Sequence, residues 1–292
     1  MAYSLTDAGK ARLERSCGPS RGDWMRMGSG ADGIERMEAF FQGYAYDPHR
    51  HDTYAFGLTL SGVQCFDYRG SRRDSLTGHA IVLHPDEVHN GRSGIPEGFS
   101  YRMLYVEPRL IRAAMGERGR ALPFASAAVS QDARLVTAVA HALDDLDAPL
   151  DALAAEDLLL PLADALLALD PSAARQGGKL IDRAAAERAR QHLDANIDAI
   201  VASSELEAIT GLDRFALARH FRASFGTSPY NYLVMRRLQR ARRLLLQGVP
   251  LADAAFACGF ADQSHLTRQF RRAYGVTPGR WRALQAGDRS QP

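Results

Sequence analysis

Three histidines are the residues of this chain best suited to form one binding site for a metal ion or a small polar molecule. His49 and His51 lie in the phrase PHRHD (48–52), and His89 lies in the phrase GHAIVLHPDEVHN (78–90). Imidazole nitrogens ligate transition metals and also hydrogen-bond small polar molecules. The residues leave three interpretations open: a metal site, a pocket for an organic effector, and histidines with a structural role.

The C-terminal part of the chain has an excess of basic side chains. Residues 1–182 hold 19 Lys and Arg against 25 Asp and Glu, a net charge of −6, whereas residues 183–292 hold 17 against 9, a net charge of +8. The two values sum to the formal net charge of +2. A basic half indicates a polyanionic partner, most simply nucleic acid. Compositional drift in an arginine-rich chain would give the same asymmetry.

Length and composition indicate the class of protein that carries these residues. The chain has 292 residues, 46% of them hydrophobic and 24% charged, which is typical of an ordinary protein of two domains. No apolar run reaches the roughly 18–20 residues of a membrane span, and the charged N-terminus does not resemble a signal peptide. The chain has three cysteines, Cys17, Cys65 and Cys258, without CxxC spacing. Their odd number and wide spacing argue against a disulfide framework and against a zinc site with thiolate ligands. We expect a cytoplasmic protein without membrane contact.

The first half has the pattern of a β structure followed by helices. Short β-type runs at 53–60, 63–70, 79–85 and 99–108 are separated by turn signals at Ser61-Gly62, Gly70-Ser71, Gly78 and the stretch 91–98, which predicts a sandwich or barrel. Helical periodicity follows between 108 and 170, and the stretch 171–179 has the composition of a linker. The aromatic candidates for lining the barrel interior are Tyr54, Phe56, Phe66, Tyr101 and Tyr105, and the alternative for each single one, which we favour, is an ordinary core residue.

The second half contains one helical pattern twice. Gly211–Phe221 and Gly259–Phe270 share a layout in which a glycine ends one helix, an apolar residue fills the turn and Asp213 or Asp262 caps the next helix. Each copy ends in a similar phrase, FGTSP (225–229) or YGVTP (274–278). We interpret the two copies as helix-turn-helix units.

A single amphipathic helix is expected to separate the two units. Ser228 is its N-cap, Pro229 its first residue, and Gly248 closes it. From 229 to 247 the helix would be roughly 28 Å long, at about 1.5 Å per residue. One turn of B-DNA is about 34 Å, so this spacer can place two recognition helices in adjacent major-groove segments.

Residues 183–284 resemble the DNA-binding domain of the AraC/XylS family of transcription regulators. The phrases TGLDRFALARHFRASFGTSPYNYL (210–233) and ACGFADQSHLTRQFRRAYGVTPGRW (257–281) carry the resemblance. It implies recognition helices at 213–224 and 262–273. The implied groove-facing residues are Arg214, Phe215, Ala218 and Arg219 in the first helix, and Gln263, Ser264, His265 and Arg268 in the second.

The chemistry of most of these positions suits base reading. Arginine can pair with guanine and glutamine with adenine, whereas Ala218 offers at best a contact to a thymine methyl group. Leu217, Phe221, Leu266 and Phe270 fall on the opposite face and are predicted core. Glu207 departs from the pattern, since a small residue is expected there. Its carboxylate either bonds the turn or reaches solvent; otherwise the first unit packs loosely.

Residues 30–108 are similar to the cupin-type ligand-binding domain of the same family, on the two histidine phrases quoted above. Catalytic cupins add a first-motif glutamate, which has no equivalent here. The resemblance therefore implies an organic effector, with no metal and no cofactor. The residues expected to bind that effector are His49, His51, Tyr54, His89 and Tyr105. A metal cupin enzyme is the competing interpretation, and elemental analysis of the protein and of a His49/His51 double alanine variant discriminates the two.

The sequence as a whole predicts an α+β protein of two domains. These are a cupin-like β-barrel with flanking helices at 1–170 and, after a linker at 171–182, an all-α domain at 183–284 with two helix-turn-helix units joined by a long helix, then a tail at 285–292. We expect a sequence-specific, effector-responsive transcription regulator, not an enzyme. Its expected partners are double-stranded promoter DNA, a small molecule, a second copy of the chain, and RNA polymerase if it activates. The leucine-rich face of 158–169 either forms the dimer interface, which we favour slightly, or covers the barrel. A purely architectural DNA-binding protein would leave the first half unexplained.

Overall fold

The computed structural model of the chain describes residues 22–116, 121–170, 172 and 181–287. The predicted linker at 171–182 lies outside the described residues except for 172, 181 and 182, and the predicted tail is described only as far as 287. Cys17 also lies outside them, whereas Cys65 and Cys258 are buried free thiols. In the described part no helix is long and apolar enough to cross a bilayer.

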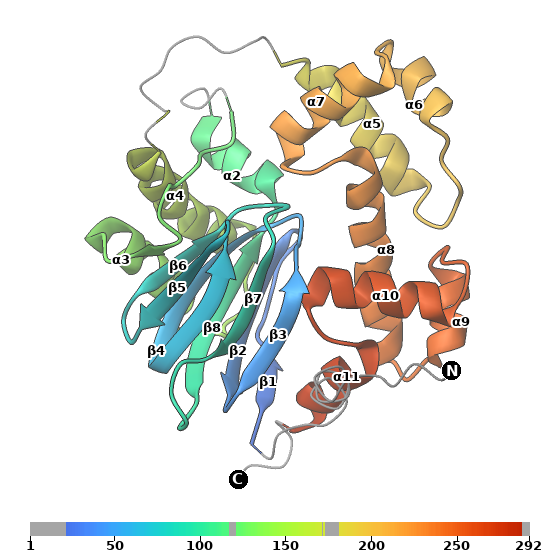
Figure 1. Cartoon of the computed structure of the whole chain (residues 1–292). Helices are drawn as coiled ribbons and strands as arrows, with labels where there is room; N and C mark the ends of the chain where they lie inside the picture. The colour runs from blue at the N-terminus through green and yellow to red at the C-terminus, as the bar shows by residue number, and fades with distance from the viewer. Residues whose placement is uncertain (1–21, 117–120, 171, 173–180, 288–292) are drawn as a thin grey trace, which may run out of the picture.

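The N-terminal half is a curved antiparallel β structure of nine strands (Figure 1). The strands are β1 (Trp24–Met27), β2 (Ile34–Phe41), β3 (Tyr44–His49), β4 (Tyr54–Tyr68), β5 (Ser71–Leu76), β6 (Ala80–Leu83), β7 (His89–Ser93), β8 (Phe99–Val106) and β9 (Val129–Ser130). One path runs β1-β2-β8-β4-β6-β9, while β3 and β7 pair with each other and β7 and β5 pair with β4. The predicted barrel class is confirmed.

The predicted turn at Ser61-Gly62 is wrong, because both residues lie within β4, a single strand of 15 residues. The register with β8 shifts between Thr59 and Ser61, and Gly62 has φ +72°. A Cβ at Gly62 would lie 2.1 Å from the carbonyl oxygen of Gly98, so only glycine allows this approach. An irregularity of this kind turns the side chains that follow to the other face of a strand. The glycine therefore marks a bulge in one strand instead of a hairpin.

This bulge corrects our grouping of the aromatic residues. Tyr54 and Phe56, before it, pack in a core with the helices outside the barrel, whereas Phe66, after it, packs in the core inside. The Tyr54 hydroxyl donates to the carbonyl oxygen of Pro123 at 2.8 Å. The prediction that Tyr54 contacts an effector in the barrel is therefore contradicted.

Three helices cover the outer side of the barrel (Figure 1): α2 (Pro108–Met115), α3 (Ala133–Ala142) and α4 (Ala152–Leu169). The leucines of α4 at 158, 159, 162 and 166 are all buried in the core that these helices share with the barrel. This contradicts our expectation that the leucine-rich face of 158–169 forms a dimer interface, because that face is already occupied within the chain. Dimerisation itself stays a prediction.

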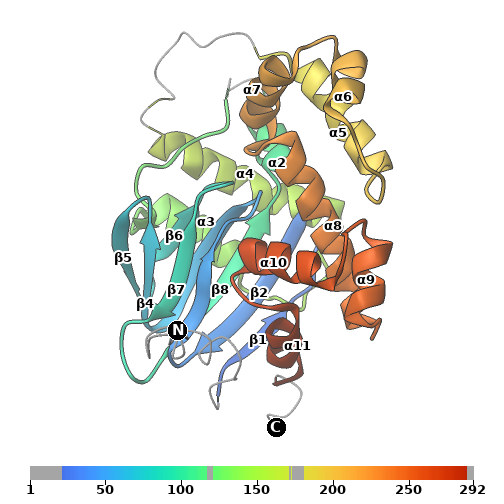
Figure 2. The same ribbon diagram turned by 45° about the vertical axis from the view of Figure 1, so that its right-hand side comes forward.

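The C-terminal half is all helical and confirms the predicted pair of helix-turn-helix units. Its helices are α5 (Arg183–Ala195), α6 (Ser203–Thr210), α7 (Arg214–Phe225), α8 (Pro229–Leu246), α9 (Leu251–Ala257), α10 (Gln263–Tyr274) and α11 (Pro278–Gly287). The pairs α6–α7 and α9–α10 lie at the two ends of α8 (Figure 2). The 18 residues of α8 correspond to about 27 Å. Asp213, Ser228 and Asp262 cap α7, α8 and α10 as predicted.

The two units are packed differently. The first has its own core, in which Leu217 and Phe221 meet Leu193 of α5. The second shares one continuous core with the barrel interior, so that Phe270 and Trp281 belong to the same cluster as Phe66 and Met103. The barrel and the second helix-turn-helix unit are thus docked onto each other.

Candidate effector cavity and nucleic-acid interface

The recognition helices α7 and α10 divide their side chains between solvent and core as the sequence predicts. Leu217, Phe221, Leu266 and Phe270 are at most 2% exposed. The implied groove-facing residues Arg214, Phe215, Arg219, Gln263, Ser264 and Arg268 are exposed or half-buried, as are Ala218 and His265. Phe215 is 69% exposed, which is unusual for a phenylalanine without a partner in water. One face of each helix therefore remains available to DNA.

Two local contacts refine this surface. The Glu207 carboxylate accepts a hydrogen bond of 2.8 Å from the backbone N–H of Arg214, the first residue of α7. Glu207 therefore bonds the turn, one of the outcomes that the sequence left open. His265 is less available than the sequence implied, because its Nδ1 accepts from the N–H of Ala261 and its ring meets Phe260 edge to face.

The C-terminal ends of both recognition helices touch the N-terminal half. At α10 the N–H of Asp47 donates to the carbonyl oxygen of Gly275 at 2.9 Å, and the N–H of Arg50 donates to that of Arg272 at 3.0 Å. At α7 the guanidinium of Arg112, on α2, donates to the carbonyl oxygen of Ala223 at 2.6 Å. The N-terminal half thereby holds the last turn of each recognition helix and leaves the reading faces outward.

Gly275→Ala tests this docking. Gly275 ends α10 with φ +68°, and a Cβ there would lie 2.7 Å from His49 Nδ1 and 2.8 Å from the carbonyl oxygen of Asp47. We expect the alanine to push α10 off β3 and to lower the thermal midpoint by more than backbone strain alone, which costs about 1–2 kcal/mol. Gly211→Ala is the matched control, since Gly211 has φ +73° and nothing within 4 Å of a Cβ. Equal destabilisation of the two variants in differential scanning fluorimetry would contradict the docking.

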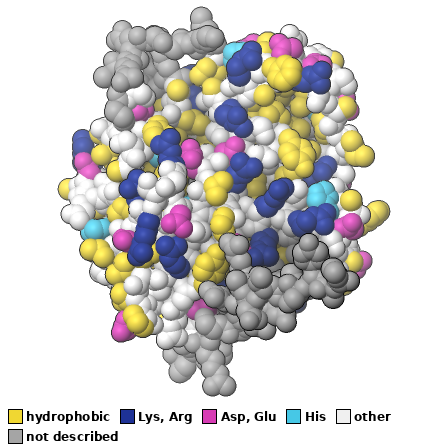
Figure 3. Space-filling view, in the orientation of Figure 1, with side chains coloured by type: hydrophobic (Ala, Val, Ile, Leu, Met, Phe, Trp, Pro, Cys, Tyr) yellow, Lys and Arg dark blue, Asp and Glu magenta, His cyan; other side chains and the backbone are white. Residues whose placement is uncertain are grey.

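Five arginines of the C-terminal half form ion pairs with acidic residues of the N-terminal half, within the residues described. The pairs are Arg222 with Asp86, Arg236 with Asp52 and Glu107, Arg242 with Glu35, Arg271 with Asp47, and Arg280 with Asp23. On the face seen in Figure 3, basic side chains are dispersed among acidic and apolar ones. The charge asymmetry of the sequence is thus used partly within the chain, a use that we did not expect from the sequence.

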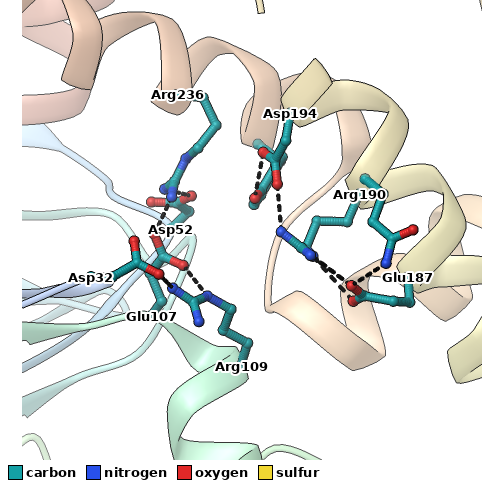
Figure 4. A network of polar contacts seen from close by, with 10 residues as sticks. Asp32, Asp52, Glu107, Arg109, Glu187, Arg190, Asp194 and Arg236 are labelled. Atoms are coloured by element: carbon teal, nitrogen blue, oxygen red, sulfur yellow. Dashed lines mark hydrogen bonds and ion pairs between the residues drawn. The ribbon is translucent and has the colours of Figure 1, made fainter. Parts of the chain in front are cut away.

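Arg236 forms a buried ion pair with each of two carboxylates (Figure 4). It reaches from α8 to Asp52 at 2.7 Å and to Glu107, and its side chain is 9% exposed. Burial raises the pKa of Asp52 to about 6, although the Arg236 guanidinium opposes this rise. Burial would lower the pKa of Arg236, but the two carboxylates outweigh it and raise this pKa.

A cavity of about 710 Å³ lies between the barrel and the C-terminal helices. The barrel contributes Met37, Phe66, Tyr101, Met103, Tyr105 and the three histidines, and the C-terminal half contributes Tyr232, Met235, Arg236, Arg242, Tyr274 and Trp281. Cavities of this size are typical of small-molecule sites. The barrel forms the floor and walls, and α8, α10 and α11 close the opening.

The predicted histidine cluster is in this cavity. His49 and His89 are cross-strand partners on β3 and β7, and their ring centroids are 4.2 Å apart. The ring of His51 lies 4.9 Å from that of His89 and 5.3 Å from that of Tyr105. Burial, together with the neighbouring imidazole, lowers the pKa of His49 and of His51 to about 3. These two rings are therefore neutral at physiological pH.

The histidine cluster does not have the arrangement of a metal site. Among the residues that the structure describes, no group of three or more His, Cys, Asp or Glu side chains is placed to hold a metal ion. His84, from the same sequence phrase as His89, is engaged elsewhere: it bonds the Tyr68 hydroxyl and accepts from the N–H of Ala125. The absence of a metal or cofactor stays a prediction.

The cavity wall contributed by the C-terminal half was missed by the sequence analysis. Arg236, Tyr274 and Trp281 belong to the helical half, and from the sequence alone they are expected to pack between its own helices. The complementary net charges of the two halves were the one available signal that they dock.

A β-barrel with an internal cavity, closed by a domain with two exposed recognition helices, defines a ligand-binding transcription regulator. The chain matches the family model of the AraC-like ligand binding domain over residues 33–163 and a helix-turn-helix domain model over residues 206–284. It belongs to the AraC/XylS family of transcription regulators and combines a ligand-binding domain with a DNA-binding domain of the family type.

Individual relatives agree with this assignment. The uncharacterised HTH-type transcriptional regulator YbfI of Bacillus subtilis is 26% identical over 220 residues, 75% of this chain and 80% of that protein. The probable transcriptional regulator LumQ of Photobacterium leiognathi is 33% identical over 92 residues, 31% of this chain and 36% of that protein.

Solved structures of ToxT from Vibrio cholerae share the fold. The apo form of a ToxT point variant has a TM-score of 0.60 at 12% identity, covering 88% of this chain and 99% of that chain. Wild-type ToxT with bound unsaturated fatty acid has a TM-score of 0.60 at 13% identity, covering 92% and 98%. At these identities the comparison concerns the fold alone.

Proposed function

We propose that this regulator binds promoter DNA sequence-specifically and that a small organic effector in the shared cavity controls how its two recognition helices are presented. The observation that carries the proposal is the composition of the cavity wall, which includes both the histidines of the barrel and residues of α8, α10 and α11. An effector that contacts both halves binds the docked arrangement more tightly than a separated one and stabilises it. The cavity and the reading surface are then linked in free energy.

A short path of hydrogen bonds supports this coupling. His49 lines the cavity, and its Nδ1 bonds the carbonyl oxygen of Asp47 at 2.8 Å. The N–H of Asp47 donates to the carbonyl oxygen of Gly275, the residue that ends α10. A ligand that moves His49 therefore acts on the strand that holds a recognition helix.

The effector contacts that we propose are His49, His51, His89 and Tyr105, all of which line the cavity. The proposed base-reading and phosphate contacts are Arg214, Phe215, Ala218 and Arg219 on α7 and Gln263, Ser264, His265 and Arg268 on α10. We retain as proposals the domain boundaries 1–170, 171–182, 183–284 and 285–292, a cytoplasmic homodimer without enzymatic activity, and contact with RNA polymerase if the output is activation.

Arg268→Ala tests the reading surface. Arg268 lies on the outward face of α10, where it can pair with guanine, and we expect the alanine variant to lose about 1–3 kcal/mol of binding free energy at one base position only. The measurement is fluorescence anisotropy with a duplex found by genomic footprinting and its single-base variants. Arg73→Ala, an exposed arginine of β5 in the barrel, is the control and should bind like the wild type. An equal loss on every duplex would show that Arg268 contacts only phosphate.

The effector link has its own test. Metabolites related to the footprinted genes are screened by thermal shift, and each hit is added to the anisotropy assay with the full chain. We expect a hit to change the DNA affinity of the wild type. A ligand that binds the cavity stoichiometrically and leaves DNA affinity unchanged would overturn the proposed control by an effector.

A further inference from the structure

We propose that the effector bound at the histidine cluster presents a hydrogen-bond donor there, a hydroxyl or a protonated amine on an apolar body, and not a carboxylate. This inference rests on the proposed function, because it names the chemical class of the molecule expected in that cavity. It is carried by the hydrogen bonds of the three rings, by an unpaired buried nitrogen and by the charge of the cavity wall.

The hydrogen bonds of the rings fix which nitrogen carries the proton. Nδ1 of His49, His51 and His89 lies 2.8, 2.9 and 3.0 Å from a backbone carbonyl oxygen. A carbonyl oxygen can only accept, so in each neutral ring Nδ1 is the donor and Nε2 carries a lone pair. Each of three rings, whose centroids lie 4.2–6.3 Å apart, thus has an acceptor at Nε2.

At least one of these acceptors is buried without a protein partner. His51 is 7% exposed, and its Nε2 has no hydrogen-bond partner among the residues described. Three acceptors cannot satisfy one another, and an unpaired buried acceptor costs free energy. A ligand donor, a hydroxyl or an ammonium N–H, recovers that free energy. A carboxylate would instead place its own lone pairs against theirs.

The rest of the wall has no net positive charge that would favour an anion. Five arginines and five carboxylates line the cavity, so their formal charges cancel. Met37, Phe66, Ile81 and Met103 supply apolar surface for the body of a ligand.

The test is a matched set of four probes: 4-phenylbutylamine, 4-phenylbutanol, 4-phenylbutanoate and the methyl ether of 4-phenylbutanol. Isothermal titration calorimetry on the full chain at pH 7.5 measures their dissociation constants. We expect the dissociation constants of the amine and the alcohol to be at least about tenfold lower than those of the ether and the carboxylate. This difference corresponds to about one buried hydrogen bond. His51→Leu should abolish this preference, whereas His141→Leu, at an exposed histidine of α3, should keep it.

A second variant covers the case in which His51→Leu does not fold. His89→Gln retains a side-chain acceptor and is expected to keep the preference for donors, and His89→Leu is expected to lose it. The proposal is overturned if the carboxylate binds most tightly, if no probe binds, or if the preference for donors survives both leucine variants. It is also overturned if the purified protein holds a stoichiometric metal that the His49/His51 double alanine variant lacks.

The readouts separate this inference from the function on which it rests. Probes that bind without regard to the donor and still change DNA affinity would contradict the ligand class alone. A clear preference for donors with no effect on DNA affinity would support the ligand class and contradict the proposed control of DNA binding.

Discussion

Arg236→Ala is expected to lower the free energy of unfolding by about 3–5 kcal/mol, the largest effect of any single substitution considered for this protein. Arg236 is 8% exposed, and its guanidinium bonds both Asp52 and Glu107 across the junction of the two halves. The alanine would leave the buried Asp52 carboxylate without its cation, whereas Glu107 would keep its ion pair with Arg109 at 2.8 Å. Differential scanning calorimetry of the full chain measures the effect as a lower midpoint and a smaller unfolding enthalpy.

Arg240→Ala is the matched control for this experiment. Arg240 lies one turn further along α8 and pairs with Asp198 at 3.3 Å, but its side chain is 43% exposed. Exposed ion pairs are worth under about 1 kcal/mol, so this variant should unfold nearly like the wild type. If both variants lost the same stability, the junction around Arg236 would not be the buried contact described above.

The second large effect is a loss of stability at mildly acidic pH. The pKa of His49 and of His51 is about 3 in the folded chain, because burial disfavours the imidazolium, against 6.5 for an unperturbed histidine. Between these values the unfolded chain binds more protons, so stability falls as pH falls through this window. When the pH falls from 7.5 to 5.5, each of the two histidines should lower the free energy of unfolding by about 1.4 kcal/mol.

Asp52 partly offsets this loss, because burial raises its pKa to about 6 and the folded chain therefore binds a proton that the unfolded chain lacks. The histidine contribution is isolated by comparing the wild type with the double variant His49→Gln/His51→Gln in urea denaturation at both pH values. The pH-dependent loss should be about 3 kcal/mol smaller in the double variant. His141→Gln, at an exposed position, should leave it unchanged. An identical pH dependence in all three proteins would mean that the cluster is hydrated and titrates normally.

The helix-turn-helix units could be predicted from the sequence almost completely, because their determinants are local. The capping aspartates, the left-handed glycines and the helical period lie within a few residues of one another, and Asp213, Gly211, Asp262 and Gly259 all have the predicted conformation or role. The spacer helix α8 was predictable for the same reason, since Ser228 and Pro229 define its start.

The barrel could be predicted as a class but not in its inner surface. Tyr54, Phe56 and Phe66 have the same parity along one strand, which suggests a common face. The irregularity between Thr59 and Ser61 reverses that parity, so Phe66 faces the cavity while Tyr54 faces the outer helices. Both faces are apolar, and the residue pattern alone cannot tell which one encloses the cavity.

Two helix-turn-helix units, a β-barrel and a cluster of histidines suited to a ligand could all be predicted from the amino-acid sequence. The three-dimensional fold was needed to see that the two halves dock and that Arg236, Tyr274 and Trp281 complete the cavity. It was also needed to see that the N-terminal half holds the ends of both recognition helices. The physical reason is the range of the forces involved. Capping and amphipathic periodicity act between near neighbours in the chain, whereas the pairing of Arg236 with Asp52, 184 positions away, depends on how two finished domains fit together.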